Sequence, residues 1–177
     1  MTDGLMLPDG AGRLIPSAGM TLKVGAERTA RWSMFEAVVQ PGFDVGAHLH
    51  HAAEELFYVL EGELDLLAFQ PAAPPGERGG DWRTWAAEDG TTVLRGGAGS
   101  SMFVPAGCPH AFANPTESPA KLLFIVTPAG HEEYLRGIGE IVGRGGVPDQ
   151  EAIREWRRRN DIEQLTPLTQ RAVGPRG

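Results

Sequence analysis

Short runs of apolar and β-branched residues, separated by glycine and proline, fill the first two thirds of the chain. Runs of this kind predict β-strands joined by tight turns. They cover residues 31–40, 47–50, 56–60, 63–69, 91–94, 101–104, 111–113 and 121–127. Pro41-Gly42 ends the first run, and Glu61-Gly62 suits a hairpin, because glycine accepts the positive φ of such turns. The pattern predicts an all-β domain, either a barrel or a two-sheet roll.

The hydrophobic period changes beyond Gly130. Apolar residues now recur at helical spacing, at Tyr134, Leu135, Ile138, Ile141 and Val142. Gly143 suits the end of this helix. Asp149 is a good N-cap for a second helix, in which Ile153 and Trp156 are expected to face inward. The chain therefore ends with two short helices.

This order of elements divides the chain into four segments. We expect an N-terminal arm over residues 1–20, a barrel over 21–128, two helices packing on the barrel over 129–162 and a flexible tail over 163–177. Residues 70–90 open with proline and glycine and predict a long loop, with a strand near 82–86. Whether this loop is a lid over a binding site stays open.

Composition narrows the function classes. The 177 residues carry a formal net charge of −7, so a nucleic-acid partner is not expected, because phosphate contacts need an excess of lysine and arginine. Cys108 is the single cysteine, which excludes an intrachain disulfide. We see neither a signal peptide nor a run of roughly 20 apolar residues for a membrane span. We expect a soluble cytoplasmic protein with a small-molecule partner.

Four residues form a candidate metal site. His48 and His50 lie two positions apart on a predicted strand, so their imidazoles point the same way. Glu55 follows after a short turn, and His110 comes after a later turn built on proline and glycine. Imidazole and carboxylate together suit a divalent transition metal, with Fe, Ni, Mn, Cu and Zn all open. Taken alone, however, such histidines are more often surface or core residues than ligands.

The flanking residues make the site distinctive. The first string runs Pro41-Gly42, five residues, His48-Leu49-His50, four residues, Glu55, six residues, Gly62. The second runs Gly99, five residues, Pro105-Ala106-Gly107, two residues, His110, three residues, Asn114. Both strings match the two signature motifs of the cupin superfamily, so the chain resembles a single-domain cupin. The resemblance implies a cupin jelly-roll β-barrel, metal ligation by His48, His50, Glu55 and His110, and a homodimer.

Strand parity also suggests which residues line a substrate pocket. Phe57 and Val59 share a face with Glu55, while Phe112 and Asn114 share one with His110. Trp32, Met34 and Phe103 are further candidates for apolar walls. For any single one of these residues, a place in the plain barrel core is the favoured interpretation. Together they predict an apolar cavity with the metal at one end.

The resemblance extends to a reaction. Residues 127–135 are similar to the tail of quercetinase-like cupins, which implies a metal-dependent dioxygenase for an enolic or phenolic substrate, with Glu55 as general base. A non-redox isomerase, lyase or polyketide cyclase is the alternative, and a non-catalytic small-molecule-binding cupin is a third. We expect Cys108 to be an inert buried thiol and the run Arg157-Arg158-Arg159 to be a solvated helix face.

Overall fold

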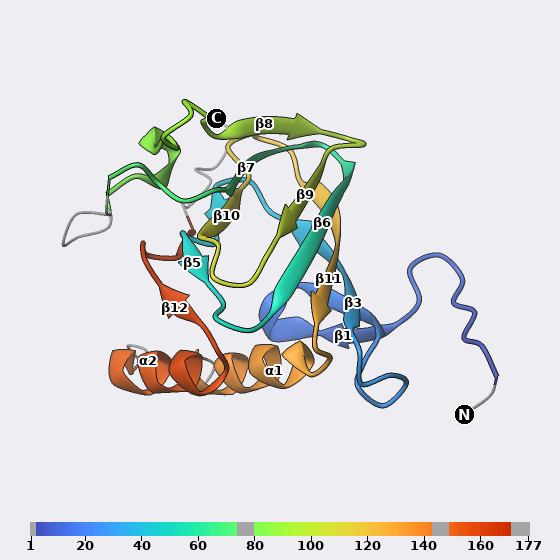
Figure 1. Cartoon of the computed structure of the whole chain (residues 1–177). Coiled ribbons are helices and arrows are strands. Elements are labelled where there is room, and N and C mark those ends of the chain that lie inside the picture. The colour runs from blue at the N-terminus through green and yellow to red at the C-terminus, as the bar shows by residue number, and fades with distance from the viewer. Residues whose placement is uncertain (1–2, 74–79, 143–148, 171–177) are drawn as a thin grey trace, which may run out of the picture.

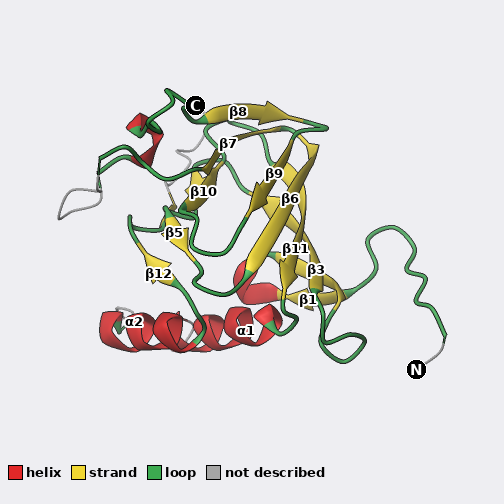
Figure 2. Ribbon diagram, viewed as in Figure 1, coloured by secondary structure: helices red, strands yellow, loops and turns green. Residues whose placement is uncertain are grey.

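The computed structural model describes residues 3–73, 80–142 and 149–170, and it consists of two β-sheets and two α-helices (Figures 1 and 2). The first sheet has the order β1 (Arg13–Ile15), β2 (Met20–Val24), β3 (Ser33–Val39), β11 (Ala120–Thr127), β6 (Glu54–Glu61) and β9 (Ser101–Val104). The second has the order β12 (Glu163–Gln164), β5 (His48–Leu49), β10 (His110–Ala113), β4 (Phe43–Asp44) and β13 (Thr169–Gln170), and β7 (Glu63–Ala68) joins β10 to β8 (Leu94–Gly97). The predicted all-β jelly roll with two C-terminal helices is confirmed.

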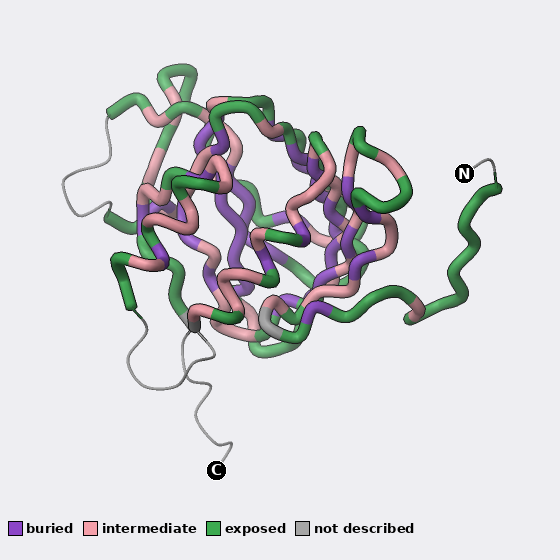
Figure 3. Tube along the Cα trace, turned by 90° about the horizontal axis from the view of Figure 1, so that it is seen from below, coloured by how far each residue is buried: buried purple, intermediate pink, exposed green. Residues whose placement is uncertain are grey.

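Three phenylalanines cross the inner face of the first sheet. Phe124 on β11 lies opposite Phe35 on β3 and Phe57 on β6 in the strand register. The rings stack, with centroids 4.7 Å apart for Phe35 and Phe124 and 5.4 Å apart for Phe57 and Phe124. Aromatic pairs across adjacent strands stabilise both the sheet and its register. Figure 3 shows that buried residues follow the strands, whereas the N-terminal segment is exposed.

The structure corrects the parity expected for β3. Trp32 and Met34 are half-buried on the outer face, and the inner face carries Ser33, Phe35, Ala37 and Val39. Apolar residues occur at both parities in this segment, so alternation alone does not select the buried face. A shift of one residue moves every side chain to the opposite side of the sheet.

The same ambiguity affects β9. Phe103 is 58% exposed on the outer face, while its neighbours Met102 and Val104 are buried in the core. Phe103 lies opposite Leu56 of β6, which is also exposed.

The homodimer expected from the resemblance stays a prediction, as does the cytoplasmic location. In the described part of the chain, no helix is long and apolar enough to cross a membrane.

Both ends of the described chain join the sheets. Residues 13–15, expected within the arm, form β1 and pair with β2. Residues 163–164 and 169–170, expected within a flexible tail, pair as β12 with β5 and as β13 with β4. These strands are too short and polar to be recognised by alternation. Residues 171–177 lie outside the described residues.

The loop over residues 70–90 packs on the barrel wall. Trp82 begins a short 3₁₀ helix (η2, Trp82–Thr84) in place of the expected strand and is 1% exposed. It contacts Ala111 and Ala113 of β10, on the side away from Phe112. Its indole Nε1 donates a hydrogen bond to Asp44, 2.9 Å away. The described part of this loop therefore covers the second sheet, and residues 74–79 lie outside the described residues.

The helices lie across one end of the barrel (Figure 1). They are α1 (His131–Val142) and α2 (Gln150–Arg159), and Asp149 caps α2 by accepting hydrogen bonds from two backbone N–H groups, as predicted. Gly143, the expected stop of the first helix, lies outside the described residues. A third short helix, η1 (Pro16–Ala18), contacts α1.

Glu132 anchors the first turn of α1 to the barrel. This carboxylate is 2% exposed and accepts hydrogen bonds from the Ser33 hydroxyl at 2.6 Å and the Ala26 backbone N–H at 2.7 Å. The Ser33 oxygen in turn accepts a hydrogen bond from the Gly130 N–H. Burial opposes ionisation, but these donors outweigh it and lower the pKa of Glu132. The helix is therefore fixed by a buried charge with satisfied hydrogen bonds.

We predict that Glu132→Gln destabilises the protein by about 2 kcal/mol at pH 7, because the amide replaces a charged acceptor by a weaker one. A carboxylate whose pKa is lower in the folded state than in the unfolded state stabilises the fold at pH values above its unfolded-state pKa. This stabilisation is lost as the pH falls through the folded-state pKa. The difference between the wild type and the variant should therefore shrink towards pH 4. Urea unfolding at both pH values measures it.

Glu133→Gln is the matched control. Glu133 is exposed and pairs with Arg136 on the helix surface, so its removal should change stability by less than about 1 kcal/mol. An equal loss for both variants, or a loss for Glu132→Gln that does not depend on pH, would contradict the anchoring role.

Candidate metal centre

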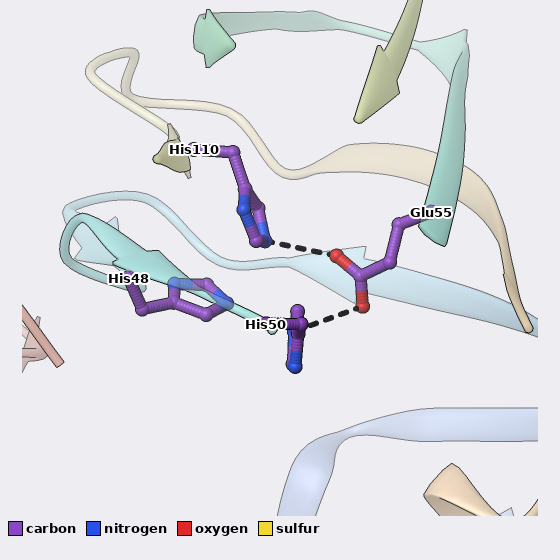
Figure 4. Close-up of side chains that lie close together, drawn as sticks. All are labelled: His48, His50, Glu55 and His110. Atoms are coloured by element: carbon purple, nitrogen blue, oxygen red, sulfur yellow. Dashed lines mark ion pairs between the residues drawn. The ribbon is translucent and has the colours of Figure 1, made fainter. Parts of the chain in front are cut away.

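The four predicted ligands converge between the two sheets. His48 lies on β5, His50 follows it directly, and His110 begins β10 opposite His48 in the strand register. Glu55 points towards them from β6 of the other sheet (Figure 4). One ligand atom from each residue can be chosen so that all four lie within 4.8 Å of one another. The closure of the jelly roll is what brings Glu55 opposite the histidines.

Backbone carbonyls orient the three imidazoles. Nδ1 of His48 lies 2.9 Å from the Gly46 oxygen, Nδ1 of His50 lies 2.9 Å from the Asp161 oxygen, and Nδ1 of His110 lies 3.1 Å from the Cys108 oxygen. A carbonyl oxygen can only accept, so each Nδ1 carries the proton. In the neutral rings each Nε2 then presents a lone pair to the interior, which is the tautomer that a metal ligand needs.

In this centre, hydrogen-bond acceptor atoms of the histidines face the acceptor oxygens of Glu55. Nε2 of His110 lies 2.9 Å from Oε2 of Glu55, and Nε2 of His50 lies 3.4 Å from Oε1 of Glu55. These histidine and Glu55 atoms are buried, and no hydrogen bond of acceptable geometry satisfies either Nε2 or Oε2. Bare lone pairs and a carboxylate repel each other at this distance unless a cation lies between them. The donor set therefore fits a divalent transition metal ion.

The electrostatics favour ligation. Burial, aided by the proximity of His110, lowers the pKa of His48 well below its ordinary value. Burial alone would raise the pKa of Glu55, but the close approach of the His110 and His50 imidazoles holds it well below its ordinary range. Burial opposes the charged form of His50 as well, yet the Glu55 carboxylate raises its pKa. At neutral pH, Glu55 is ionised and His48 is neutral.

Asp161 supports the centre from beyond the barrel and was not predicted. Its carbonyl accepts the His50 hydrogen bond, and its carboxylate accepts from the backbone N–H groups of His51, Ala52 and Ala53. Asp161 has φ 60°, a left-handed conformation that aspartate tolerates better than most residues. One residue thus fixes both the His50 ring and the loop that leads to Glu55. No sequence signal distinguishes it from other surface aspartates.

Two neighbouring residues lie outside the ligand cluster. His51 is exposed and pairs with Glu163, with 3.2 Å between Nε2 and the carboxylate. Cys108 is buried, and burial raises the pKa of its thiol. Its sulfur lies 3.5 Å from the Pro109 carbonyl oxygen. A thiol with a raised pKa is a poor metal ligand, in keeping with the expected inert role.

A cavity of about 290 Å³ opens from the centre towards the helices, and its walls are mainly apolar. Glu55 and His48 lie in its wall, together with Phe57 and Phe112 of the expected pocket. Further lining residues are Phe43, Val45, Phe124, His131, Tyr134, Leu135, Ile138, Arg157, Ile162 and Leu168. No described residue of the 70–90 loop lines it, so α1 and α2 cover this cavity and the described part of the loop does not.

The remaining pocket candidates have structural places. Val59 is buried in the core but does not line the cavity. Asn114 is 1% exposed, and its amide nitrogen donates to the carbonyl oxygens of Val39 and Ser118. Its side-chain oxygen accepts from Thr116, so Asn114 holds the turn between β10 and β11. Trp32, Met34 and Phe103 lie on outer faces, as described above.

The helices contribute polar cavity residues that the pocket prediction missed. His131 packs against the rings of His50, Phe124 and Tyr134, and burial lowers the pKa of His131 to about 4, so it is neutral at pH 7. Arg157 lies four residues after the buried Ile153. That helical spacing would have placed it on the inward face, had the arginine run not suggested a solvated surface.

The chain belongs to the cupin family, whose model matches residues 19–136. No curated protein sequence matches it. Among solved structures, an uncharacterized protein with a double-stranded β-helix domain from Klebsiella pneumoniae is 14% identical over 70% of this chain and 84% of that one, with TM-score 0.45. A protein of Thermus thermophilus is 24% identical over 62% of this chain and 84% of that one, with TM-score 0.43.

A third structure similar to the chain is the DMSP lyase DddQ of Ruegeria pomeroyi. It is 21% identical over 61% of this chain and 45% of the lyase, with TM-score 0.44. Likeness at this level assigns no activity to the chain.

We predict that Asp161→Ala weakens metal binding by about 10-fold to 100-fold, because the His50 ring and the following loop lose their support. Asp161→Asn should bind with intermediate affinity, since asparagine tolerates the left-handed conformation and keeps one side-chain acceptor. Competition with a chromophoric chelator for Zn²⁺ measures the affinities.

The control for this pair is His51→Ala. It removes an exposed imidazole but leaves the backbone N–H group of residue 51, which donates a hydrogen bond to Asp161. The variant should therefore bind Zn²⁺ with wild-type affinity. If Asp161→Ala bound Zn²⁺ as tightly as the wild type, the supporting role of Asp161 would be wrong. If His51→Ala lost the metal, the ligand set would be wrong.

Proposed function

We propose that this cupin is a metal-dependent dioxygenase that acts on an enolic or phenolic organic substrate, in the manner of quercetin 2,3-dioxygenases. The observation that supports the proposal is the position of Glu55. Its ionised carboxylate lies in the ligand cluster and also in the wall of an apolar cavity. A base at that position can reach a hydroxyl proton of a molecule in the cavity.

Each part of the site has a task in this reaction. When bound by His48, His50, Glu55 and His110, a divalent transition metal supplies Lewis acidity at this end of the cavity. The Glu55 carboxylate accepts the hydroxyl proton of the substrate, which leaves an electron-rich enolate or phenolate. Dioxygen is the oxidant, and both of its atoms enter the products as the ring or a C–C bond is cleaved.

The apolar walls favour a flat organic substrate. Phe57, Phe112 and Phe124 present their rings beside Glu55 and His48, and α1 closes the cavity with Leu135 and Ile138. Such walls exclude water, which strengthens the electrostatic interactions of the carboxylate with the bound molecule. A cavity of about 290 Å³ accommodates a compact substrate.

The two alternatives predict different measurements. A non-redox isomerase, lyase or cyclase would convert its substrate without oxygen, whereas a binding protein would bind without turnover. Metal analysis of the purified chain, with oxygen uptake measured against flavonols, diketones and related enols, separates the three. Stoichiometric metal with turnover under anaerobic conditions would overturn the dioxygenase proposal.

We predict that Glu55→Gln retains part of the metal, because three imidazoles remain, but lowers turnover by about 10²-fold to 10⁴-fold, since the amide cannot accept the proton. Metal content and oxygen uptake are measured on the same sample. Glu54→Gln is the matched control: Glu54 precedes Glu55 on β6 and is exposed, so its removal should leave both values unchanged. Normal turnover in Glu55→Gln would make the base assignment wrong.

A further inference from the structure

Away from the metal ligands, few polar side chains line the cavity. They are His131, Tyr134, Arg157 and Gln164. The Gln164 amide nitrogen already donates to the backbone carbonyls of Val45, Ala47 and Thr166. The Tyr134 hydroxyl and the Arg157 guanidinium contact each other. This contact joins α1 to α2 where the helices cover the cavity.

Arg157 differs from the other arginines of α2. Arg154 pairs with Glu151, and Arg158 and Arg159 both pair with Glu155 on the exposed helix surface. Among the described residues, no carboxylate lies within ion-pair distance of Arg157, and its Nε is buried without a hydrogen-bond partner. The expectation of a solvated arginine face therefore holds for Arg158 and Arg159 but not for Arg157.

A guanidinium that has no carboxylate partner and whose buried Nε has no acceptor is unfavourable in a largely apolar wall. A buried donor without an acceptor loses its hydration and gains nothing in return. The planar fork of arginine matches a carboxylate, which can accept two parallel hydrogen bonds. Tyr134 adds a hydroxyl donor beside the fork. Burial raises the pKa of Tyr134, with the Arg157 charge partly opposing this, so the hydroxyl keeps its proton at neutral pH.

Arg157 also borders a second hollow, on the outer side of α2. Its charged lining is mixed, with Arg154 and Arg158 beside Asp161 and Glu163, and Ile162 and Gln164 line both hollows with Arg157. Arg157 thus lies between a polar surface hollow and the apolar cavity.

We propose that Arg157 and Tyr134 form a subsite for the carboxylate of the substrate. The substrate is then an organic acid with an apolar, preferably aromatic, body that lies along the phenylalanine wall. Its hydroxyl lies at the end lined by His48 and Glu55, and its carboxylate lies at the end lined by the helices. This inference rests on the proposed function for the reacting end, and it adds the chemical class of the substrate.

A matched pair of probes tests the subsite. The full chain is loaded with Zn²⁺ and titrated calorimetrically with 3-phenylpropanoate and with the neutral 3-phenylpropanamide. The wild type should prefer the carboxylate by at least about tenfold, because a charged pair in an apolar wall is lost with the amide. Arg157→Gln should abolish this preference and leave the amide affinity unchanged. Arg157→Lys should keep part of it, and Tyr134→Phe should reduce it by a few-fold.

Arg158→Gln is the matched control, since it removes one positive charge from the next position of the same helix. It should bind both probes as the wild type does. The subsite is wrong if the wild type shows no preference for the carboxylate, if Arg157→Gln keeps the preference, or if Arg158→Gln loses as much. A carboxylate bound at the metal would be recognised by its loss in His110→Ala and its persistence in Arg157→Gln, and this too would overturn the proposal.

The subsite and the reaction can fail independently. Zinc content and far-ultraviolet circular dichroism of each variant show whether the fold and the metal centre are intact. A carboxylate preference that depends on Arg157, in a chain that consumes no oxygen with any acid tested, would uphold the subsite and end the dioxygenase proposal. Oxygen uptake with a neutral enol that Arg157→Gln leaves unchanged would support the dioxygenase proposal. It would contradict the proposal that the substrate is an organic acid.

Discussion

The centre of this molecule is a buried carboxylate that faces imidazole lone pairs. Glu55 is 4% exposed, His110 is fully buried, and their ligand atoms lie 2.9 Å apart. Backbone carbonyls accept hydrogen bonds from the three Nδ1–H groups, so each neutral imidazole turns a lone pair towards the ionised carboxylate. Only a cation resolves the repulsion. Closure of the two sheets at this point is favourable where a cation such as a metal ion compensates the charge of Glu55.

Residues beyond the barrel complete this centre. The family match ends at residue 136, yet Asp161 holds the His50 ring and the loop before Glu55. Thr166 accepts a hydrogen bond from the backbone of Ala47, next to His48, and β12 pairs with β5. The strand that carries His48 is only two residues long and has few hydrogen bonds of its own. The C-terminal segment therefore supplies the rigidity that such a short strand lacks.

The sequence was sufficient for the ligands and for the helices, but not for the walls of the site. His48, His50, Glu55 and His110 stand at a spacing that few folds share, and Asp149 marks the start of α2 by a local capping interaction. Parity failed on β3 and β9 because apolar residues occupy both faces of those strands, so local alternation carries no information on which face is buried. Which face of these strands is buried depends on contacts with residues such as Phe124, which come from a distant part of the chain.

Residues that act through long-range contacts were equally hidden. Asp161 and Arg157 look like ordinary charges of a polar helix end, and their roles follow only from what the fold places beside them. In Arg157 the helical period did contain a signal, since Ile153 marks the buried face. The run of three arginines instead favoured a solvent-exposed position for Arg157. For Arg157, its position on the buried face of the helix was therefore a better guide to its surroundings than its membership of a run of arginines.

The division of labour between the barrel and the helices has a chemical consequence. His48, Glu55 and His110 lie on strands whose register is fixed by backbone hydrogen bonds, and Asp161 holds the ring of His50, so this end of the site is rigid. Two further polar groups of the cavity wall, Tyr134 and Arg157, come from α1 and α2, and α1 is held by the buried carboxylate of Glu132. A change on the helices can therefore alter which molecule enters without disturbing the metal ligands. Under the proposed function, selection of the substrate and activation of the substrate would be carried by separate parts of the fold.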